Sequence, residues 1–180
     1  MNKNLLPGVV LLVIGLICGV LLAFINSITA PIIKANADKI ILDSLAEVYI
    51  GASSYNLTEE EGTGNVDKLF ILSDKTSGDT VAIIYSVKAE GYQSTVNMLI
   101  AVEFVNSSEY IVKGYKVVSQ GETSGIGDKI VNHDFKMVNA SITNLSTFDA
   151  VSGATFSSGA VRTCFESVST RVASDFGGAQ

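Results

Sequence analysis

The sequence predicts an α+β protein in which one N-terminal transmembrane helix precedes an antiparallel sheet with flanking helices. Three observations support this fold class. A long apolar stretch begins the chain, four runs of alternating apolar residues follow, and a helical apolar pattern comes last. The 180 residues, 47% of them hydrophobic, have room for one domain behind an anchor. We therefore expect an anchor helix over residues 1–30 and a domain over residues 31–180.

The first element is a membrane-spanning helix. Every residue from Val9 to Ile25 is apolar or glycine, and the wider stretch Leu5–Ile28 covers a hydrocarbon core of ~30 Å at ~1.5 Å per residue. A helix satisfies its own backbone hydrogen bonds in that core. A cleaved signal peptide has a shorter apolar core, and here the candidate cleavage site after Ala30 is followed by Pro31. We therefore expect an uncleaved anchor.

Apolar residues continue at helical spacing beyond the anchor. The helix is expected to run on, kinked at Pro31, to about Tyr49, with Gly51 as its stop signal. Residues 52–65 are rich in Gly, Ser, Thr and Glu and predict a polar loop. The three glutamates at 59–61 are interpreted as a solvated turn of that loop rather than a metal site.

Four strands are expected next, because apolar residues alternate with polar or small ones. Within the second strand, for example, Val81, Ile83 and Tyr85 alternate in this way. The strands are predicted at Val66–Ser73, Thr80–Ala89, Thr95–Val105 and Tyr110–Ser119, with a turn at Asp74–Asp79 and a hairpin linker at Asn106–Glu109. The result is an antiparallel sheet.

The last part of the chain combines a loop with one long helix. Residues 125–139 are interpreted as a loop with a short helical turn. From Ser157 to Asp175 one helix face carries the apolar residues Val161, Phe165, Val168 and Val172. This face predicts packing against the sheet.

Composition excludes several kinds of site. The net charge is −6 and no basic stripe is present, which argues against nucleic-acid binding. Cys18 lies in the anchor and Cys164 in the last helix, so they cannot form a disulfide within one chain, and each is expected to be a small apolar residue. His133 is the sole histidine, which leaves no His-rich metal site or catalytic triad. We expect neither catalytic nor metal-binding residues.

The string Asp149-Ala150-Val151-Ser152-Gly153-Ala154-Thr155 places a hydroxyl at a loop-to-helix junction. Gly153 allows a backbone conformation closed to other residues, and Ala154 adds little bulk. A bulky partner could therefore reach the hydroxyl of Thr155. The free amides that begin the helix favour a phosphate by ~0.3–1 kcal/mol. The alternative is an ordinary capping loop, with Ser or Thr as the N-cap residue.

A second motif, Gln120-Gly121-Glu122-Thr123-Ser124-Gly125-Ile126-Gly127-Asp128-Lys129-Ile130, is rich in glycine. Gly125 and Gly127 would let the backbone approach a flat ring, and Thr123 could hydrogen-bond to its polar edge. The alternative is a glycine-rich surface turn. Gly91-Tyr92 follows the second strand, and Tyr92 is either a ring-stacking residue or an edge tyrosine of the sheet.

These strings resemble those of a known family. Asp149–Thr155 matches, at each fixed position, the flavinylation motif Asp-x-x-Ser/Thr-Gly-Ala-Thr/Ser. Glu122–Gly127 is similar to the segment Glu-Thr-Pro-Gly-Leu-Gly, with Ser124 and Ile126 replacing Pro and Leu. The family contains the G subunit of the Rnf electron-transport complex and the related C subunit of the sodium-pumping quinone reductase. The resemblance extends over nearly the whole chain.

The resemblance implies an FMN-binding domain with FMN joined through its phosphate to Thr155. A magnesium-dependent flavin transferase that takes FAD as donor would read Asp149 and the residues before the threonine. The implied cofactor contacts are Thr155, Ser152, Gly153, Ala154, Glu122, Thr123, Gly125, Ile126, Gly127 and Tyr92.

The resemblance also implies a role. The chain would be a single-pass protein of the cell (inner) membrane, with its N-terminus in the cytoplasm and its FMN domain outside. It would relay electrons within an Rnf complex, an ion-translocating ferredoxin:NAD oxidoreductase, beside integral membrane subunits, and would need no catalytic site of its own. The alternatives are an anchored module that binds flavin without a covalent bond and a stand-alone flavinylated domain for extracellular electron transfer.

Overall fold

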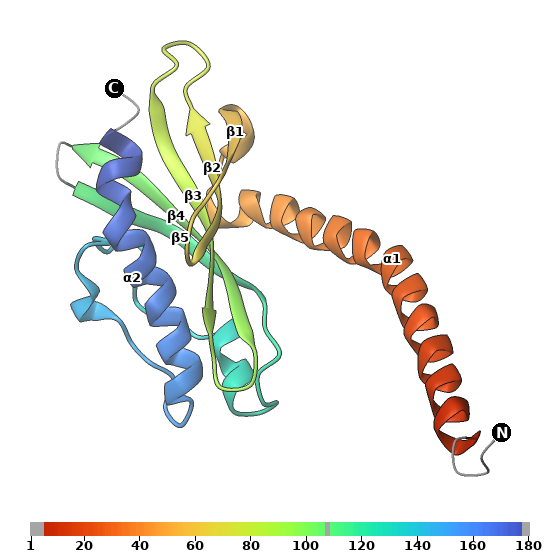
Figure 1. Ribbon diagram of the computed structural model, residues 1–180. Coiled ribbons are helices and arrows are strands. Elements are labelled where there is room, and N and C mark those ends of the chain that lie inside the picture. The colour runs from red at the N-terminus through yellow and green to blue at the C-terminus, as the bar shows by residue number, and fades with distance from the viewer. Residues whose placement is uncertain (1–5, 107–108, 178–180) are drawn as a thin grey trace. The chain divides into compact units, whose positions relative to one another are not determined.

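A computed structural model of the protein describes residues 6–106 and 109–177 (Figure 1). The chain divides into two compact units between Ile40 and Ile41. The elements in order are helix α1 (Leu6–Val48), the 3-10 helix η1 (Ala52–Ser54), strands β1 (Asn56–Glu61), β2 (Val66–Ser73), β3 (Thr80–Glu90), β4 (Thr95–Asn106) and β5 (Glu109–Ser119), the 3-10 helices η2 (Gly127–Val131) and η3 (Leu145–Thr147), and helix α2 (Thr155–Gly177).

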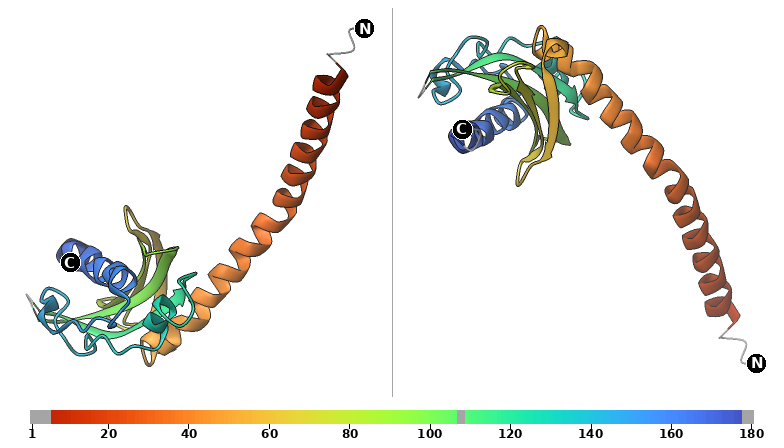
Figure 2. Two further views of the ribbon diagram at one scale, coloured as in Figure 1. Left: turned by 90° about the horizontal axis from the view of Figure 1, so that it is seen from below. Right: turned by 90° about the horizontal axis from the view of Figure 1, so that it is seen from above.

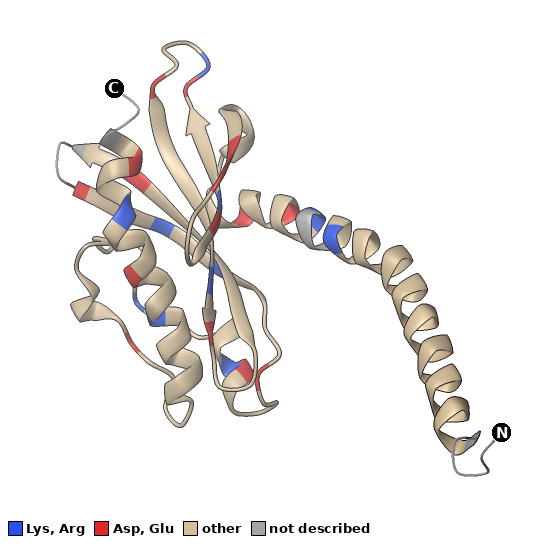
Figure 3. Cartoon of the chain, in the orientation of Figure 1, with Lys and Arg blue, Asp and Glu red and all other residues tan. Residues whose placement is uncertain are grey.

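The first unit contains most of α1, which is a candidate membrane span. An 18-residue window of this helix has a mean hydropathy of 3.1. Its apolar side chains lie exposed, with Leu11 at 73% and Leu16 at 63%. Figure 3 shows no charged residue on α1 until the lysines in its second half, of which Lys34 is the first. The helix stays continuous through Pro31 and ends at Val48, close to the end that its apolar spacing predicts.

The second unit is built on a five-stranded antiparallel sheet in the order β1-β2-β3-β4-β5. The four predicted strands are confirmed, each within one residue at either end. In the turn between β2 and β3, Gly78 has a φ of 79°, and the carboxylate of Asp74 accepts hydrogen bonds from the amides of Thr76 and Ser77. The predicted linker at 106–109 contains residues 107–108, which lie outside the described residues.

The predicted polar loop at 52–65 is wrong, because it contains the edge strand β1 (Asn56–Glu61). The glutamates at 59–61 therefore belong to a strand rather than a turn, and Glu59 forms an ion pair with Lys68 on β2 at 2.7 Å. All six residues of β1 are exposed. A strand that is solvated on both faces has no apolar alternation, so the pattern that marks the other strands is missing from its sequence.

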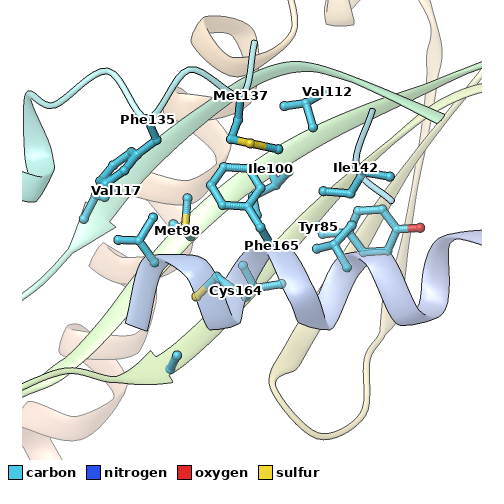
Figure 4. Packing of buried hydrophobic residues seen from close by; sticks show 14 of the residues in the cluster. Tyr85, Met98, Ile100, Val112, Val117, Phe135, Met137, Ile142, Cys164 and Phe165 are labelled. Carbon is cyan, nitrogen blue, oxygen red and sulfur yellow. The ribbon is translucent and has the colours of Figure 1, made fainter. Parts of the chain in front are cut away.

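Helix α2 covers one face of the sheet, as Figures 1 and 2 show. The predicted apolar face is confirmed: Val161, Phe165, Val168 and Val172 are each 0% exposed. Figure 4 shows Phe165 and Cys164 of α2 opposite side chains of the sheet and of the segment that contains Phe135. This core packs α2 against the sheet and so fixes the position of the helix, which begins at Thr155.

The last two turns of α1 are part of the second unit and cover the opposite face of the sheet. Leu45, Val48 and Tyr49 are buried in a second core with Phe70, Leu72, Ala82, Ile84, Leu99 and Ala101. The hydroxyl of Tyr49 donates to the Glu103 carboxylate at 3.2 Å, and Lys116 forms an ion pair with Glu47 at 2.7 Å. Residues 41–49 therefore stabilise the sheet.

We expect Gly114→Ala to destabilise the second unit. A Cβ at Gly114 would collide with the carbonyl oxygen of Val48 on the backbone of α1. Overpacking of this kind costs about 1–3 kcal/mol. Urea unfolding of the full-length chain in detergent would measure the loss. Gly159→Ala in α2 is the control, because no heavy atom lies within 4 Å of the added Cβ, and this change is expected to stabilise the helix slightly. Equal stability of the two variants would contradict the packing described here.

Candidate functional site

A cavity of about 270 Å³ opens beside the first turn of α2. Three segments of the chain line it. The lining residues are Tyr92 after β3; Glu122, Thr123, Ile126 and Gly127 after β5; and Gly153, Ala154, Thr155, Phe156 and Ser157 at the start of α2. The two sequence motifs and the Gly-Tyr string therefore meet at one place in the fold.

The carboxylate of Glu122 joins these three segments. One oxygen accepts hydrogen bonds from the amides of Gln93 and Ser94, at 3.1 and 3.0 Å, and from the Ser94 hydroxyl at 3.3 Å. The other accepts from the Tyr92 amide at 3.1 Å and from the Ser157 hydroxyl at 2.6 Å. We call these residues the Glu122 cluster. Glu122 is only 7% exposed and Ser157 only 2%, so the hydrogen bond between them is buried at the centre of the cluster.

The environment of Glu122 favours its ionised form. Burial of the carboxyl raises its pKa, but the hydrogen bonds from Ser157 and from the amides of residues 92–94 outweigh burial, and the pKa lies below the ordinary value of 4.5. The carboxylate is therefore charged at neutral pH. Because the folded-state pKa is depressed, the cluster stabilises the fold above pH 4.5, and this contribution is lost as the pH falls through the folded-state pKa.

Helix α2 begins at Thr155, two residues before the predicted start at Ser157. The turn before it is tightly held, because the Val151 amide donates to the Ser158 hydroxyl at 2.9 Å and the Ala154 amide donates to the Val151 carbonyl at 3.1 Å. Gly153 has a φ of 80°, the left-handed conformation expected from the sequence. Thr155 is exposed at the cavity, and the first turn of α2 carries no acidic side chain.

Two aromatic rings lie at the cavity. Tyr92 and Phe156 are 71% and 72% exposed, and their ring centroids are 5.9 Å apart at an interplanar angle of 42°. Ile126, 52% exposed, adds a third apolar side chain. Sequence reasoning missed Phe156 as a site residue. The sequence does contain a signal for Phe156. It is a large apolar residue next to Thr155, and it does not lie on the helix face that carries Phe165 and Val168.

Within the glycine-rich motif, Gly127 also lies against other residues of the chain. A Cβ at Gly127 would meet the Ser157 Oγ at 2.6 Å and the Glu122 Cβ at 2.8 Å. The absence of a side chain there makes room for the Glu122 cluster. Gly125, with a φ of 77°, has no heavy atom near such a Cβ and forms the turn next to the cavity. The Thr123 hydroxyl donates to the side-chain oxygen of Gln93 at 3.1 Å.

Asp149 and Ser152 are exposed and do not line the cavity. The Asp149 amide donates to the Phe135 carbonyl at 3.0 Å. His133 Nε2 donates to the Asp149 carbonyl at 3.1 Å, so the one histidine supports this loop. Ser152 lies in the turn before α2, and both Asp149 and Ser152 are accessible to solvent.

Comparison with known proteins agrees with this arrangement. The model of the family described as "FMN-binding domain" matches residues 91–169, a segment that contains every residue lining the cavity. The G subunit of an ion-translocating oxidoreductase complex from Erwinia tasmaniensis is 33% identical over 132 residues, which are 68% of this chain and 60% of that protein. The chain thus spans about 60% of the length of this relative. The segment that forms the cavity therefore matches a family that is described by its binding of FMN.

Proposed function

We propose that the chain is the electron-relay subunit of a membrane-bound ion-translocating ferredoxin:NAD oxidoreductase, an Rnf complex, and that it carries FMN as a phosphoester of Thr155. The observation that carries this proposal is the meeting of both sequence motifs at one cavity, with the Thr155 hydroxyl exposed there. The similarity to the G subunit of an ion-translocating oxidoreductase complex supports the wider role.

The residues at the cavity suit FMN. The apolar side chains of Tyr92, Ile126 and Phe156 offer contacts for a flat ring system. The N-terminus of α2 favours the phosphate, since the first amides of a helix have no carbonyl partner within it. The volume of about 270 Å³ lies near the lower end of the ~300–1,000 Å³ found for small-molecule sites. We therefore expect bound FMN to stay partly exposed, which leaves it accessible to a redox partner.

The chemistry at this site would come from the cofactor, because FMN supplies reversible electron transfer when bound. The side chains of the chain bind and orient it. Thr155 would hold the phosphate, and Tyr92 and Phe156 would contact the ring. An electron relay would need no general base. Separately, no group of three or more His, Cys, Asp or Glu side chains that could hold a metal ion is found among the described residues.

Attachment of FMN requires a partner enzyme. The bond that forms joins the Thr155 hydroxyl oxygen to the FMN phosphorus of FAD. The pyrophosphate bond breaks, AMP leaves, and the hydroxyl proton passes to a base of the flavin transferase. The exposed positions of Asp149 and Ser152 fit recognition by that enzyme, and Gly153 and Ala154 leave the hydroxyl accessible.

Helix α1 would anchor the chain in the cell (inner) membrane in a single pass. In this arrangement the N-terminus lies in the cytoplasm, and the FMN domain faces the other side of the membrane. The neighbours would be the integral membrane subunits of the complex. Figure 3 supports an anchor, since the first half of α1 carries none of the coloured charged residues.

The mass of the intact chain tests the proposal. Full-length protein purified from membranes of a host that makes the transferase should be heavier by one FMN less one water. Proteolysis should place that mass on the peptide that contains Thr155. Flavin fluorescence should stay with the band in a denaturing gel. An unmodified chain whose flavin is released on denaturation would overturn covalent attachment and favour a non-covalent flavin-binding module.

A further inference from the structure

The Glu122 carboxylate is fully occupied by donors from the protein itself. It accepts five hydrogen bonds, from the amides of residues 92–94 and the hydroxyls of Ser94 and Ser157. An ionised carboxylate offers about four lone-pair sites. Although Glu122 lines the cavity, it therefore has no remaining capacity to accept a hydrogen bond from a ligand. Its effect on a bound group must come from its charge and from the segments that it holds together.

Among the residues that the structure describes, no cation forms an ion pair with this carboxylate. All five donors are neutral amides or hydroxyls. Glu122 is hydrogen-bonded but has no charged partner in the described part of the chain, and it is only 7% exposed. The protein around it is less polarisable than water. Its electric field on a neighbouring group is therefore stronger than that of a carboxylate at the surface.

We propose that Glu122 is a positioning residue that fixes the three segments around the cavity and whose negative charge lowers the reduction potential of FMN bound there. This inference rests on the proposed function, because it requires FMN in the cavity. Reduction adds electrons to the ring system, and a fixed anion in the cavity wall opposes that addition. One side chain both holds the three segments together and carries the negative charge. The shape of the cavity and the reduction potential of FMN bound there would therefore depend on the same residue.

Glu122→Gln separates the charge from the shape of the side chain. Full-length flavinylated wild-type and variant chains would be titrated by spectroelectrochemistry at neutral pH, after their masses confirm equal flavin content. We expect the midpoint potential of the variant to shift in the positive direction. Glu90→Gln is the matched control: it removes the same charge from an exposed residue at the end of β3, where solvent screens the field, and it should shift the potential far less.

The outcomes distinguish this inference from the proposed function. A wild-type chain without attached FMN would contradict the proposed function. If wild type and Glu122→Gln both carry FMN and have the same potential, the role of Glu122 is overturned while the proposed function stands. A shift in Glu90→Gln as large as that in Glu122→Gln would also overturn it, because the effect would then be one of net charge.

A second variant keeps the test decisive if Glu122→Gln does not fold. Glu122→Asp retains the charge but shortens the side chain, so the potential should stay close to that of the wild type. The amides of residues 92–94, which donate to the carboxylate in the wild type, should exchange with solvent faster by hydrogen-exchange mass spectrometry. A positive shift in potential, or unchanged exchange of these amides, would contradict the proposal.

Discussion

Thr155→Ala is expected to abolish covalent attachment of FMN and to leave the domain folded. The substitution removes the hydroxyl that would form the phosphoester. It should cost little stability, because Thr155 is exposed and the turn before α2 is held by Val151, Ala154 and Ser158. In-gel flavin fluorescence and intact mass measure attachment, and thermal unfolding measures the fold. We expect the fluorescence of the band to fall to background, with a change in unfolding free energy within ~0.5 kcal/mol.

Two further variants serve as controls for Thr155→Ala. Thr155→Ser keeps a hydroxyl at the position, and the motif accepts serine there, so attachment should persist. Thr58→Ala removes an exposed threonine from β1 and should leave attachment unchanged. Flavin found on the C-terminal peptide of Thr155→Ala would show that another residue bears the cofactor.

Phe165→Ala is expected to produce the largest loss of stability among these variants. Phe165 is 0% exposed, and its ring packs edge-on against Tyr115 at a centroid distance of 5.4 Å and against Phe148 at 6.1 Å. Removal of a buried phenyl ring costs about 3–5 kcal/mol, since the lost burial and the cavity left behind both contribute. Figure 4 shows this ring within the core between α2 and the sheet. Urea unfolding of the full-length chain measures the effect.

Phe156→Ala is a matched control in the same helix. Phe156 is 72% exposed and contacts the ring of Tyr92, so its loss should change the unfolding free energy by less than ~0.5 kcal/mol. It should nevertheless change the absorbance or fluorescence of the attached flavin, because Phe156 lines the cavity. Equal destabilisation by the two substitutions would contradict the packing of α2, and an unchanged flavin spectrum would contradict a ring contact by Phe156.

Much of the fold could be predicted because elements that pack against a core leave an apolar period in the sequence. Strands β2 to β5 carry apolar side chains into the two cores, with β3 buried on both of its faces, and α2 buries one continuous face. Strand β1 left no such period, because all its residues are exposed. Its position depends on hydrogen bonding to β2, and backbone pairing of this kind is compatible with almost any polar side chain.

The residues of the candidate site could be predicted better than their interactions. The strings around Glu122 and Thr155 were recognisable as motifs, and they meet at the cavity. The hydrogen bond from Ser157 to Glu122 joins residues 35 positions apart, and no local pattern indicates such a partner. The role of Gly127 was hidden for the same reason, since its missing side chain accommodates atoms from two distant segments.

The outer edge of the sheet has a consequence for crowding. Strand β1 is at the end of the strand order, and its last three residues, Glu59, Glu60 and Glu61, are exposed glutamates. An edge strand invites pairing with a second copy, and charges along the edge oppose it. In the proposed arrangement, anchored copies would diffuse in two dimensions and meet often, and mutual repulsion between these edges would keep them from joining into aggregates.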